Sequence, residues 1–389
     1  MATSIYDQLG VRPHINCATT YTRLGGSVMR PHVAQAMADA AGYFVNIFDL
    51  HVALGKRLAT LTSNEAAYVS NGAAAGLALA AAACITGDDP ALMARLPAQT
   101  DGMKNEIVVH RVQRNWYDIA IRQVGAKLVE IGHSLETQAW ELDDAINERT
   151  AAVFYFAGSH LNRHTLPLPY VVGRAHARGV PVIVDAAAQA LPVSNLWRFT
   201  TEDGADAAVF SGGKGLRGPQ NSGLVVGTER LVRAMRLNGP PHQRIGRSMK
   251  TSKEAMIGLL AAVEAYLETD FEAEALVWSR VVDQWINAWS PTAPNGIEVS
   301  RLELNEAGEP IPRVIVRLLP GIPATRDELV TALRDGDPSI EVVLHDETSV
   351  AVSPHLLQDG EAWQVEQRVL QLWQELDSRN LAPAGARNV

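Results

Sequence analysis

Short and almost continuously apolar runs recur along the middle of the chain, separated by segments with a helical pattern. The runs are rich in Val, Ile and Ala and occupy 106–110, 127–131, 151–156, 181–185, 207–211 and 223–227. Stretches such as Leu142–Arg149 and Tyr170–Gly179 lie between them and are typical of helices. Continuous apolar runs, unlike alternating ones, indicate strands that are buried on both faces. The pattern predicts an α/β fold with a mostly parallel central sheet covered by helices.

The residues before this region are predicted to be largely helical, after an extended N-terminal arm. A helix is expected over 30–41 with Pro31 in its first turn, and another over Asp49–Leu61. The alanine-rich run Gly72–Gly87 is shorter than the ~20 residues that a membrane span needs. It is expected to form a buried helix that ends at Gly87.

The character of the chain changes after residue 250. A long helical stretch over 252–289 precedes four strand-like segments, a hairpin-like loop at 305–312 and two further helices, Arg326–Arg334 and Glu361–Asp377. The expected organisation is an N-terminal arm and helix (1–48), a large α/β domain (49–250), a linking helix with a small α+β domain (251–380) and a frayed tail (381–389).

Composition restricts the classes of partner. The chain has 389 residues, of which 47% are hydrophobic, and a net charge of -9. An acidic chain without a basic block is not expected to bind nucleic acid. Cys17 and Cys84 form neither a C-x-x-C motif nor a disulfide framework, and no signal peptide precedes them, so we expect a cytoplasmic protein that is not associated with a membrane.

A single lysine, Lys214, lies in a glycine-rich turn directly after a predicted strand, with Gly212 and Gly213 before it and Gly215 after it. Such a lysine is most often a solvated turn residue. A P-loop is excluded, because its lysine follows the second glycine and precedes Ser or Thr. The third interpretation is a lysine whose amine forms a Schiff base with a carbonyl cofactor.

Two other segments bear on this choice. Val69–Gly76 is a glycine turn that opens into the alanine-rich helix, and it is either a tight turn or an anion site formed by backbone N–H groups. Asp185 ends a buried strand, where it is either a helix N-cap or a ligand-binding carboxylate. A phosphate site, a carboxylate for a pyridine nitrogen and a lysine for an aldehyde are together what pyridoxal 5'-phosphate needs.

The chain resembles fold-type I pyridoxal-phosphate enzymes, and among them the group related to bacterial selenocysteine synthase and D-glucosaminate-6-phosphate ammonia-lyase. The resemblance rests on "INCATTYTRLGGSVM", "AAYVSNGAAAGLALA", "VIVDAAAQALPVSNLWRF", "DAAVFSGGKGLRGPQNSGLVVG" and "GRSMKTSKEAMIGLLAA". The lysine segment is also similar to that of cysteine desulfurases, which have a phosphate-binding histidine where this chain has Gly213. The phosphate contacts are therefore expected to differ in part.

The resemblance implies roles for particular residues. Lys214 would hold the cofactor aldehyde and Asp185 the pyridine nitrogen, and Ala187 would lie under the ring. The phosphate would be bound by Gly72, Ala73, Ala74 and Ser211. The other face of the ring would be covered from 110–118, with Arg114 as the first choice and Gln113, Asn115 and Trp116 as alternatives, unless this segment is only a surface helix.

Three basic residues near the end of the large domain are candidates for binding the substrate. The resemblance implies an arginine for the substrate carboxylate, and we expect this to be Arg247, with Lys250 or Arg244 near any second anionic group. A basic surface between domains is the alternative. The same resemblance implies a homodimer, or a multiple of one.

The resemblance favours a lyase that removes the α-proton of a 2-amino-3-hydroxy acid and releases ammonia and a 2-keto acid. A racemase, an aldolase or an aminotransferase remains an alternative, as does a binding protein without catalysis. His160 and His164 have the spacing of a metal pair, but the prolines that follow argue against a helix, so no metal is expected. His160 or Asn162 is a candidate for lining the site instead.

Overall fold

The computed structural model describes residues 5–158, 164–322 and 324–381, and it divides into two compact units. The larger comprises Gly25–Thr269 with Ala307–Glu309. The smaller comprises Met1–Leu24, Asp270–Glu306 and Pro310–Val389. None of the described helices is both long enough and apolar enough to cross a bilayer.

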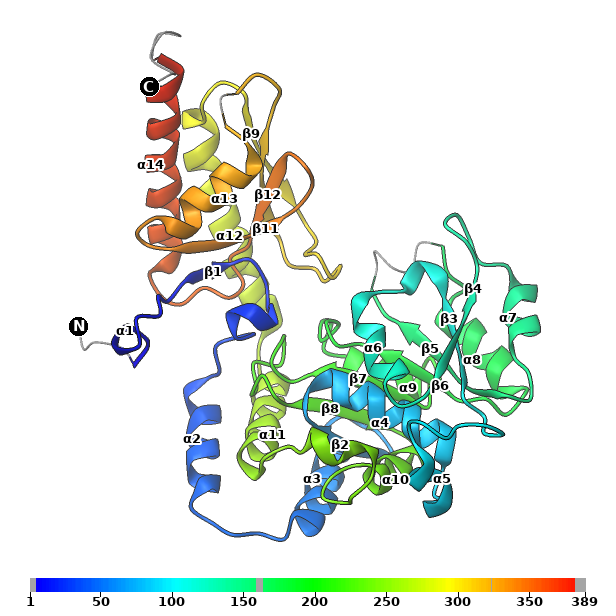
Figure 1. Ribbon diagram of the computed structural model, residues 1–389. Helices are drawn as coiled ribbons and strands as arrows, with labels where there is room; N and C mark the ends of the chain where they lie inside the picture. The colour runs from blue at the N-terminus through cyan, green and yellow to red at the C-terminus, as the bar shows by residue number, and fades with distance from the viewer. Residues whose placement is uncertain (1–4, 159–163, 323, 382–389) are drawn as a thin grey trace. The chain divides into compact units, whose positions relative to one another are not determined.

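The larger unit is built on a seven-stranded sheet with the order β2-β8-β7-β6-β5-β3-β4 (Figure 1). β8 is antiparallel to both of its neighbours, and all other pairs are parallel. The six predicted strands of this region are all present, and the fold prediction is confirmed. The strands are β2 (Ala66–Ser70), β3 (Glu106–His110), β4 (Lys127–Ile131), β5 (Thr150–Phe156), β6 (Val182–Asp185), β7 (Ala207–Ser211) and β8 (Gly223–Gly227).

Helices cover both faces of this sheet. The alanine-rich helix α4 (Gly72–Thr86) is buried from Ala75 to Ala83 and contacts β7 and β8, because its small side chains allow close approach. α9 (Asn195–Thr201) covers the opposite face, where Phe199 lies 6.4 Å from Phe210. The other helices of the unit are α2 (Pro31–Ala41), α3 (Ile47–Leu61), α5 (Pro90–Arg95), α6 (Ile119–Arg122), α7 (Ala139–Ala145), α8 (Leu168–His176), α10 (Glu229–Asn238) and α11 (Lys253–Leu267).

The smaller unit contains a five-stranded sheet with the order β1-β11-β12-β10-β9. Its strands are β1 (Ile15–Cys17), β9 (Ile297–Leu302), β10 (Arg313–Leu318), β11 (Ile340–Leu344) and β12 (Ser349–Val352). Its helices are α1 (Ile5–Gln8), α12 (Phe271–Trp289), α13 (Arg326–Asp335) and α14 (Glu361–Leu381). β1 comes from the N-terminal arm and pairs in parallel with β11.

The long helical stretch predicted over 252–289 is two helices. α11 ends at Leu267, and the Asp270 side chain accepts a hydrogen bond from the Ala273 N–H at 3.0 Å, so it caps a new helix, α12. The first helix belongs to the larger unit and the second to the smaller one. A periodicity that continues across a cap does not reveal such a break.

Candidate active site

The predicted lysine, aspartate and phosphate turn all lie at one edge of the seven-stranded sheet. Ser70, at the end of β2, and Ser211, at the end of β7, both pair with Gly223 of β8. Asp185, at the end of β6, pairs with Val209 of β7. The carboxyl ends of the parallel strands therefore bring together three segments that are far apart in sequence, where α/β sheets bind ligands.

The glycine turn after β2 leads directly into the first turn of α4. Gly72 has a φ of +79°, which favours glycine. The Asn71 side chain makes no cap hydrogen bond, so no side-chain cap occupies the N–H groups of the first turn, which include those of Ala73 and Ala74. The geometry is that of an anion site at a helix N-terminus.

The glycines of the lysine turn are in close contact with other parts of the protein. A Cβ on Gly213 would lie 2.5 Å from Gln220 Cα, and one on Gly212 would lie 2.1 Å from Ser222 Oγ. A histidine at position 213, as in cysteine desulfurases, would therefore require the backbone to move. The absence of that side chain follows from local packing.

Ser27 holds the lysine turn from the N-terminal side of the chain. Its N–H donates to Gly213 O at 3.0 Å, and its Oγ lies 3.0 Å from both Gly213 O and Lys214 O. Gly26, with a φ of +78°, permits this approach, because a Cβ there would lie 2.5 Å from Gly213 O. Sequence reasoning did not identify Ser27 as part of the site.

Asp185 is positioned by its own strand end. Its Oδ1 accepts a hydrogen bond from the Ala187 N–H at 3.0 Å. Burial raises the pKa of Asp185, while the Ala187 N–H and the Lys214 charge act in the opposite direction. A protonated ring nitrogen beside the carboxylate would further favour its ionised form, so the residue fits a pyridinium partner.

Arg114, the first choice for covering the ring, forms ion pairs with two carboxylates. Its Nε donates to Asp118 Oδ2 at 2.5 Å and its Nη1 to Glu130 Oε1, so two carboxylates hold the guanidinium. From the same segment, the ring of Tyr117 lies 6.0 Å from Lys214 Nζ. Tyr117, which was not among the predicted alternatives, is therefore better placed than Arg114 to cover a ring bound to the lysine.

Two of the other predicted alternatives differ sharply in exposure. Trp116 is 95% exposed, and the Gln113 side chain is buried, where its Oε1 accepts a hydrogen bond from the Phe156 N–H at 3.1 Å. Gln113 thus joins the ends of β3 and β5. Beside it, burial lowers the pKa of His110 to about 4, so this histidine is neutral at physiological pH.

The three basic candidates lie around a short 3₁₀ helix, Ile245–Met249, that contacts α4. Arg247 and Lys250 are exposed and Arg244 is half-buried. Within the described ranges, none of the three side chains makes an ion pair with a carboxylate. Arg247 and Lys250 are therefore accessible to a ligand, and Arg244 is partly accessible.

His160 and Asn162 lie outside the residues that the structure describes. Within the described part of the chain, no three His, Cys, Asp or Glu side chains are grouped as metal ligands would be.

Comparison with known proteins identifies the family. The family model described as "SelA: L-seryl-tRNA selenium transferase" matches residues 15–293. A D-glucosaminate-6-phosphate ammonia lyase of Salmonella typhimurium is 36% identical over 82% of this chain and 83% of its own length. The chain belongs to the SelA family.

Two further similar proteins agree with this family assignment. A 5'-C-glycyluridine monooxygenase-decarboxylase of Streptomyces is 38% identical over 70% of this chain and 68% of its own length. A solved structure of D-glucosaminate-6-phosphate ammonia-lyase superposes with a TM-score of 0.83 at 31% identity, covering 97% of this chain and 100% of the other.

Membership of the SelA family confirms the fold-type I resemblance and makes the chain an enzyme that uses pyridoxal 5'-phosphate. The described residues fit this group. A helix N-terminus without a side-chain cap suits the phosphate. A lysine and a buried carboxylate at the same edge suit the aldehyde and the ring nitrogen.

Proposed function

We propose that the protein is an ammonia-lyase that converts a 2-amino-3-hydroxy acid into a 2-keto acid and ammonia. The observation that carries the proposal is the 36% identity to an ammonia lyase over most of both chains. The location of Lys214, Asp185 and Gly72 at one edge of the sheet supports it.

In this proposal each residue of the site has one task. The N–H groups of Gly72, Ala73 and Ala74 and the Ser211 hydroxyl bind the cofactor phosphate. Asp185 keeps the ring nitrogen protonated, and Ala187 orients Asp185 through its N–H while lying under the ring. When bound, the cofactor supplies an electron sink for the substrate α-carbon.

Lys214 moves the proton. Its amine would accept the proton from Cα, and the ammonium so formed would give a proton to the β-hydroxyl. The hydroxyl then leaves as water, while the electron pair of the C–H bond forms a Cα–Cβ double bond. The resulting enamine takes up a proton at Cβ, and hydrolysis of the imine consumes one water and releases ammonia. The net change is therefore loss of ammonia from the substrate, with no oxidant or reductant required.

Substrate recognition is assigned to the basic residues after α10. We propose that Arg247 binds the α-carboxylate through a bidentate contact, and that Lys250 or Arg244 binds a second anionic group. The relative from Salmonella is named for a substrate that carries both a carboxylate and a phosphate. A phosphorylated sugar acid is accordingly the first substrate to test.

A second candidate follows from the relative in Streptomyces, whose name describes a monooxygenase that decarboxylates. Such a reaction would cleave the bond between Cα and the carboxylate and release CO₂, while O₂ oxidises Cα to an amide carbon; one oxygen atom would stay there and the other would be reduced to water. Racemisation and aldol cleavage are further outcomes that the same electron sink permits.

One experiment separates these reactions. The holoenzyme is incubated in deuterated water with D-glucosaminate 6-phosphate and with D- and L-hydroxy amino acids. Ammonia together with a keto acid is the expected result. Deuterium at Cα with inverted configuration would mean a racemase, glycine with an aldehyde an aldolase, and CO₂ with oxygen uptake a decarboxylating oxygenase. Each of these would overturn the proposal.

We also propose that the protein is a cytoplasmic homodimer, or a multiple of one, that binds no tRNA. Tyr43, Phe44, Val45 and Phe48 form an exposed apolar segment of the larger unit, which a second copy would cover. Sedimentation that finds only active monomers would contradict the dimer. A mobility shift with uncharged and serylated tRNA would contradict the absence of an RNA partner.

A further inference from the structure

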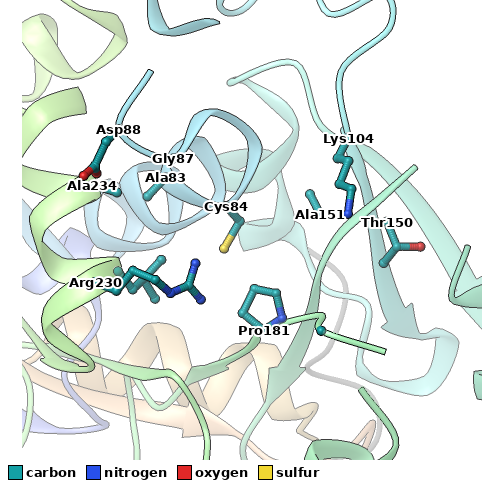
Figure 2. Close-up of a pocket in the computed structure, with 12 residues that line it drawn as sticks. Ala83, Cys84, Gly87, Asp88, Lys104, Thr150, Ala151, Pro181, Arg230 and Ala234 are labelled. Atoms are coloured by element: carbon teal, nitrogen blue, oxygen red, sulfur yellow. The ribbon is translucent and has the colours of Figure 1, made fainter. Parts of the chain in front are cut away.

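A pocket of about 380 Å³ lies at the amino edge of the seven-stranded sheet, away from the candidate active site. Its walls are the C-terminal end of α4, the loop before β3, the first residues of β5, the residues before β6, and α10 (Figure 2). Pro181 lines it directly before β6, and Asp185 ends the same strand. Four residue steps along the strand place their Cα atoms about 13 Å apart.

Two cations from different elements face this pocket. Figure 2 shows the Arg230 guanidinium directed into it from α10 and the Lys104 ammonium on its other side. Lys104 has no ion-pair partner among the described residues. The site therefore combines a planar donor with a point charge.

The acidic side chains near the pocket are already engaged. Asp88, on its rim, pairs with Arg233 at 3.1 Å. Asp206 lies 3.9 Å from Arg230, but it accepts hydrogen bonds from His176 and from the Val182 N–H, both at 2.8 Å. The charge of Arg230 is thus only partly offset, by a carboxylate 3.9 Å away that other donors share.

The rest of the lining is mainly apolar. The residues that provide this surface are Ala83, Cys84, Ala151, Pro181, Leu231 and Ala234. A volume of this size, with an apolar surface and few polar groups, is typical of small-molecule sites. The two cations would orient one charged end of a ligand, and the apolar surface would cover the remainder.

We propose that this pocket is a second binding site, separate from the catalytic one, for a small organic anion in which a carboxylate or phosphate is joined to a compact apolar group. Arg230 and Lys104 bind the anionic end, and the side chains of α4, β5 and α10 cover the apolar end. The proposal is independent of which reaction the enzyme catalyses.

Cys84 makes the pocket directly observable. Its Sγ points into the cavity (Figure 2), whereas Cys17, the other cysteine, is fully buried. Burial raises the pKa of Cys84 to about 12, so its alkylation is slow and requires alkaline pH and long incubation. A ligand in the pocket would slow it further by covering the sulfur.

The test measures alkylation of Cys84 by iodoacetamide in the holoenzyme, by mass spectrometry of the Cys84 peptide. Benzoate and phenyl phosphate are the anionic probes, and benzamide is their neutral counterpart. The variants are Lys104→Met, Arg230→Met and the double change. Lys127→Met, an exposed lysine at the same edge but outside the pocket lining, is the matched control.

Benzoate or phenyl phosphate is expected to protect Cys84 with a dissociation constant on the order of 1 mM or below, and benzamide is not. Each single change should weaken protection roughly 3-fold, and the double change about 10-fold. Lys127→Met should leave protection intact. Because Arg230 lowers the pKa of Cys84, Arg230→Met slows the basal reaction, so protection is compared as a ratio of rates for each variant.

Three results would overturn the proposal: no protection by either anion, equal protection by benzamide, or unchanged protection in the double variant. The difference between benzoate and phenyl phosphate identifies the anionic group that the pocket prefers. Binding of a probe at the catalytic edge would leave the alkylation rate of Cys84 unchanged, so the two sites are distinguished.

Discussion

Ser27→Ala tests whether the N-terminal segment holds Lys214, the proposed catalytic lysine, in place. The change removes a hydroxyl that contacts the carbonyls of Gly213 and Lys214. Both carbonyls keep a partner, because the Ser27 N–H still donates to Gly213 O and the Arg217 N–H still donates to Lys214 O at 2.9 Å. The free energy of unfolding is therefore expected to fall by the net contribution of one hydrogen bond, about 1 kcal/mol. The larger cost of leaving a buried carbonyl without a partner does not apply.

The assay follows the visible absorbance of the bound cofactor during urea unfolding, because this signal reports the unit that contains the lysine. Turnover is measured on the same preparations. It is expected to fall, because the lysine turn keeps the hydrogen bond from the Ser27 N–H but loses the contacts with the Ser27 hydroxyl. Thr60→Ala is the control, because it also removes a hydroxyl donor to a backbone carbonyl, that of Lys56 on α3.

Equal effects of Ser27→Ala and Thr60→Ala on both measurements would show that Ser27 does not hold the turn. A decrease of more than about 3 kcal/mol in the free energy of unfolding would contradict the argument that both carbonyls keep a hydrogen-bond donor, because a decrease of that size requires carbonyls without a partner.

Four further changes test other parts of the site and the fold. Lys214→Ala should abolish the yellow colour and the turnover, and native turnover in a reconstituted variant would exclude this lysine. Asp185→Asn should bind the cofactor weakly and lose most activity, because an amide cannot hold the ring nitrogen protonated; cofactor titration and kinetics measure the two effects separately. Arg247→Lys should raise KM, since lysine lacks the bidentate geometry, and unchanged KM and kcat would remove Arg247 from the site. Burial lowers the pKa of His51 from 6.5 to about 4. As the pH falls from 6.5 to 4, His51 therefore takes up a proton in the unfolded chain but not in the folded one, which lowers the free energy of unfolding by up to about 3 kcal/mol. His51→Phe should retain stacking on Tyr68 and flatten this pH dependence in acid unfolding, and an unchanged slope would contradict the argument.

The sheet could be predicted because strands buried on both faces have a local signature. Val and Ile runs at 106–110 and 181–185 were recognised as strands, and both are present. β2 was not among the predicted strands; its sequence AAYVS is short and leads directly into the glycine turn. The division between α11 and α12 was missed for a similar reason, because the apolar periodicity continues through Asp270.

Contacts between residues that are far apart in the sequence were the hardest to predict. Lys214 and Asp185 could be named because they lie at the carboxyl ends of two recognised strands, which meet at one edge of the sheet, whereas Gly72 was named from the glycine turn before the alanine-rich helix. Tyr117 and Ser27 carry no such signal, since only the fold brings them to the lysine. Arg114 was favoured by its offset from a strand, but nothing in the sequence shows that Asp118 and Glu130 hold its guanidinium.

The glycines of the lysine turn are required by contacts within the protein itself. A glycine-rich turn around a lysine is also compatible with a close approach of the backbone to a ligand. In the structure, Gly212, Gly213 and Gly218 are instead pressed against Ser222, Gln220 and Ala262 of the protein itself. The turn is therefore shaped by its own packing before any ligand binds, which fixes the backbone of Lys214. Such preorganisation is what the proposed roles of Lys214, holding the cofactor and moving a proton, would require.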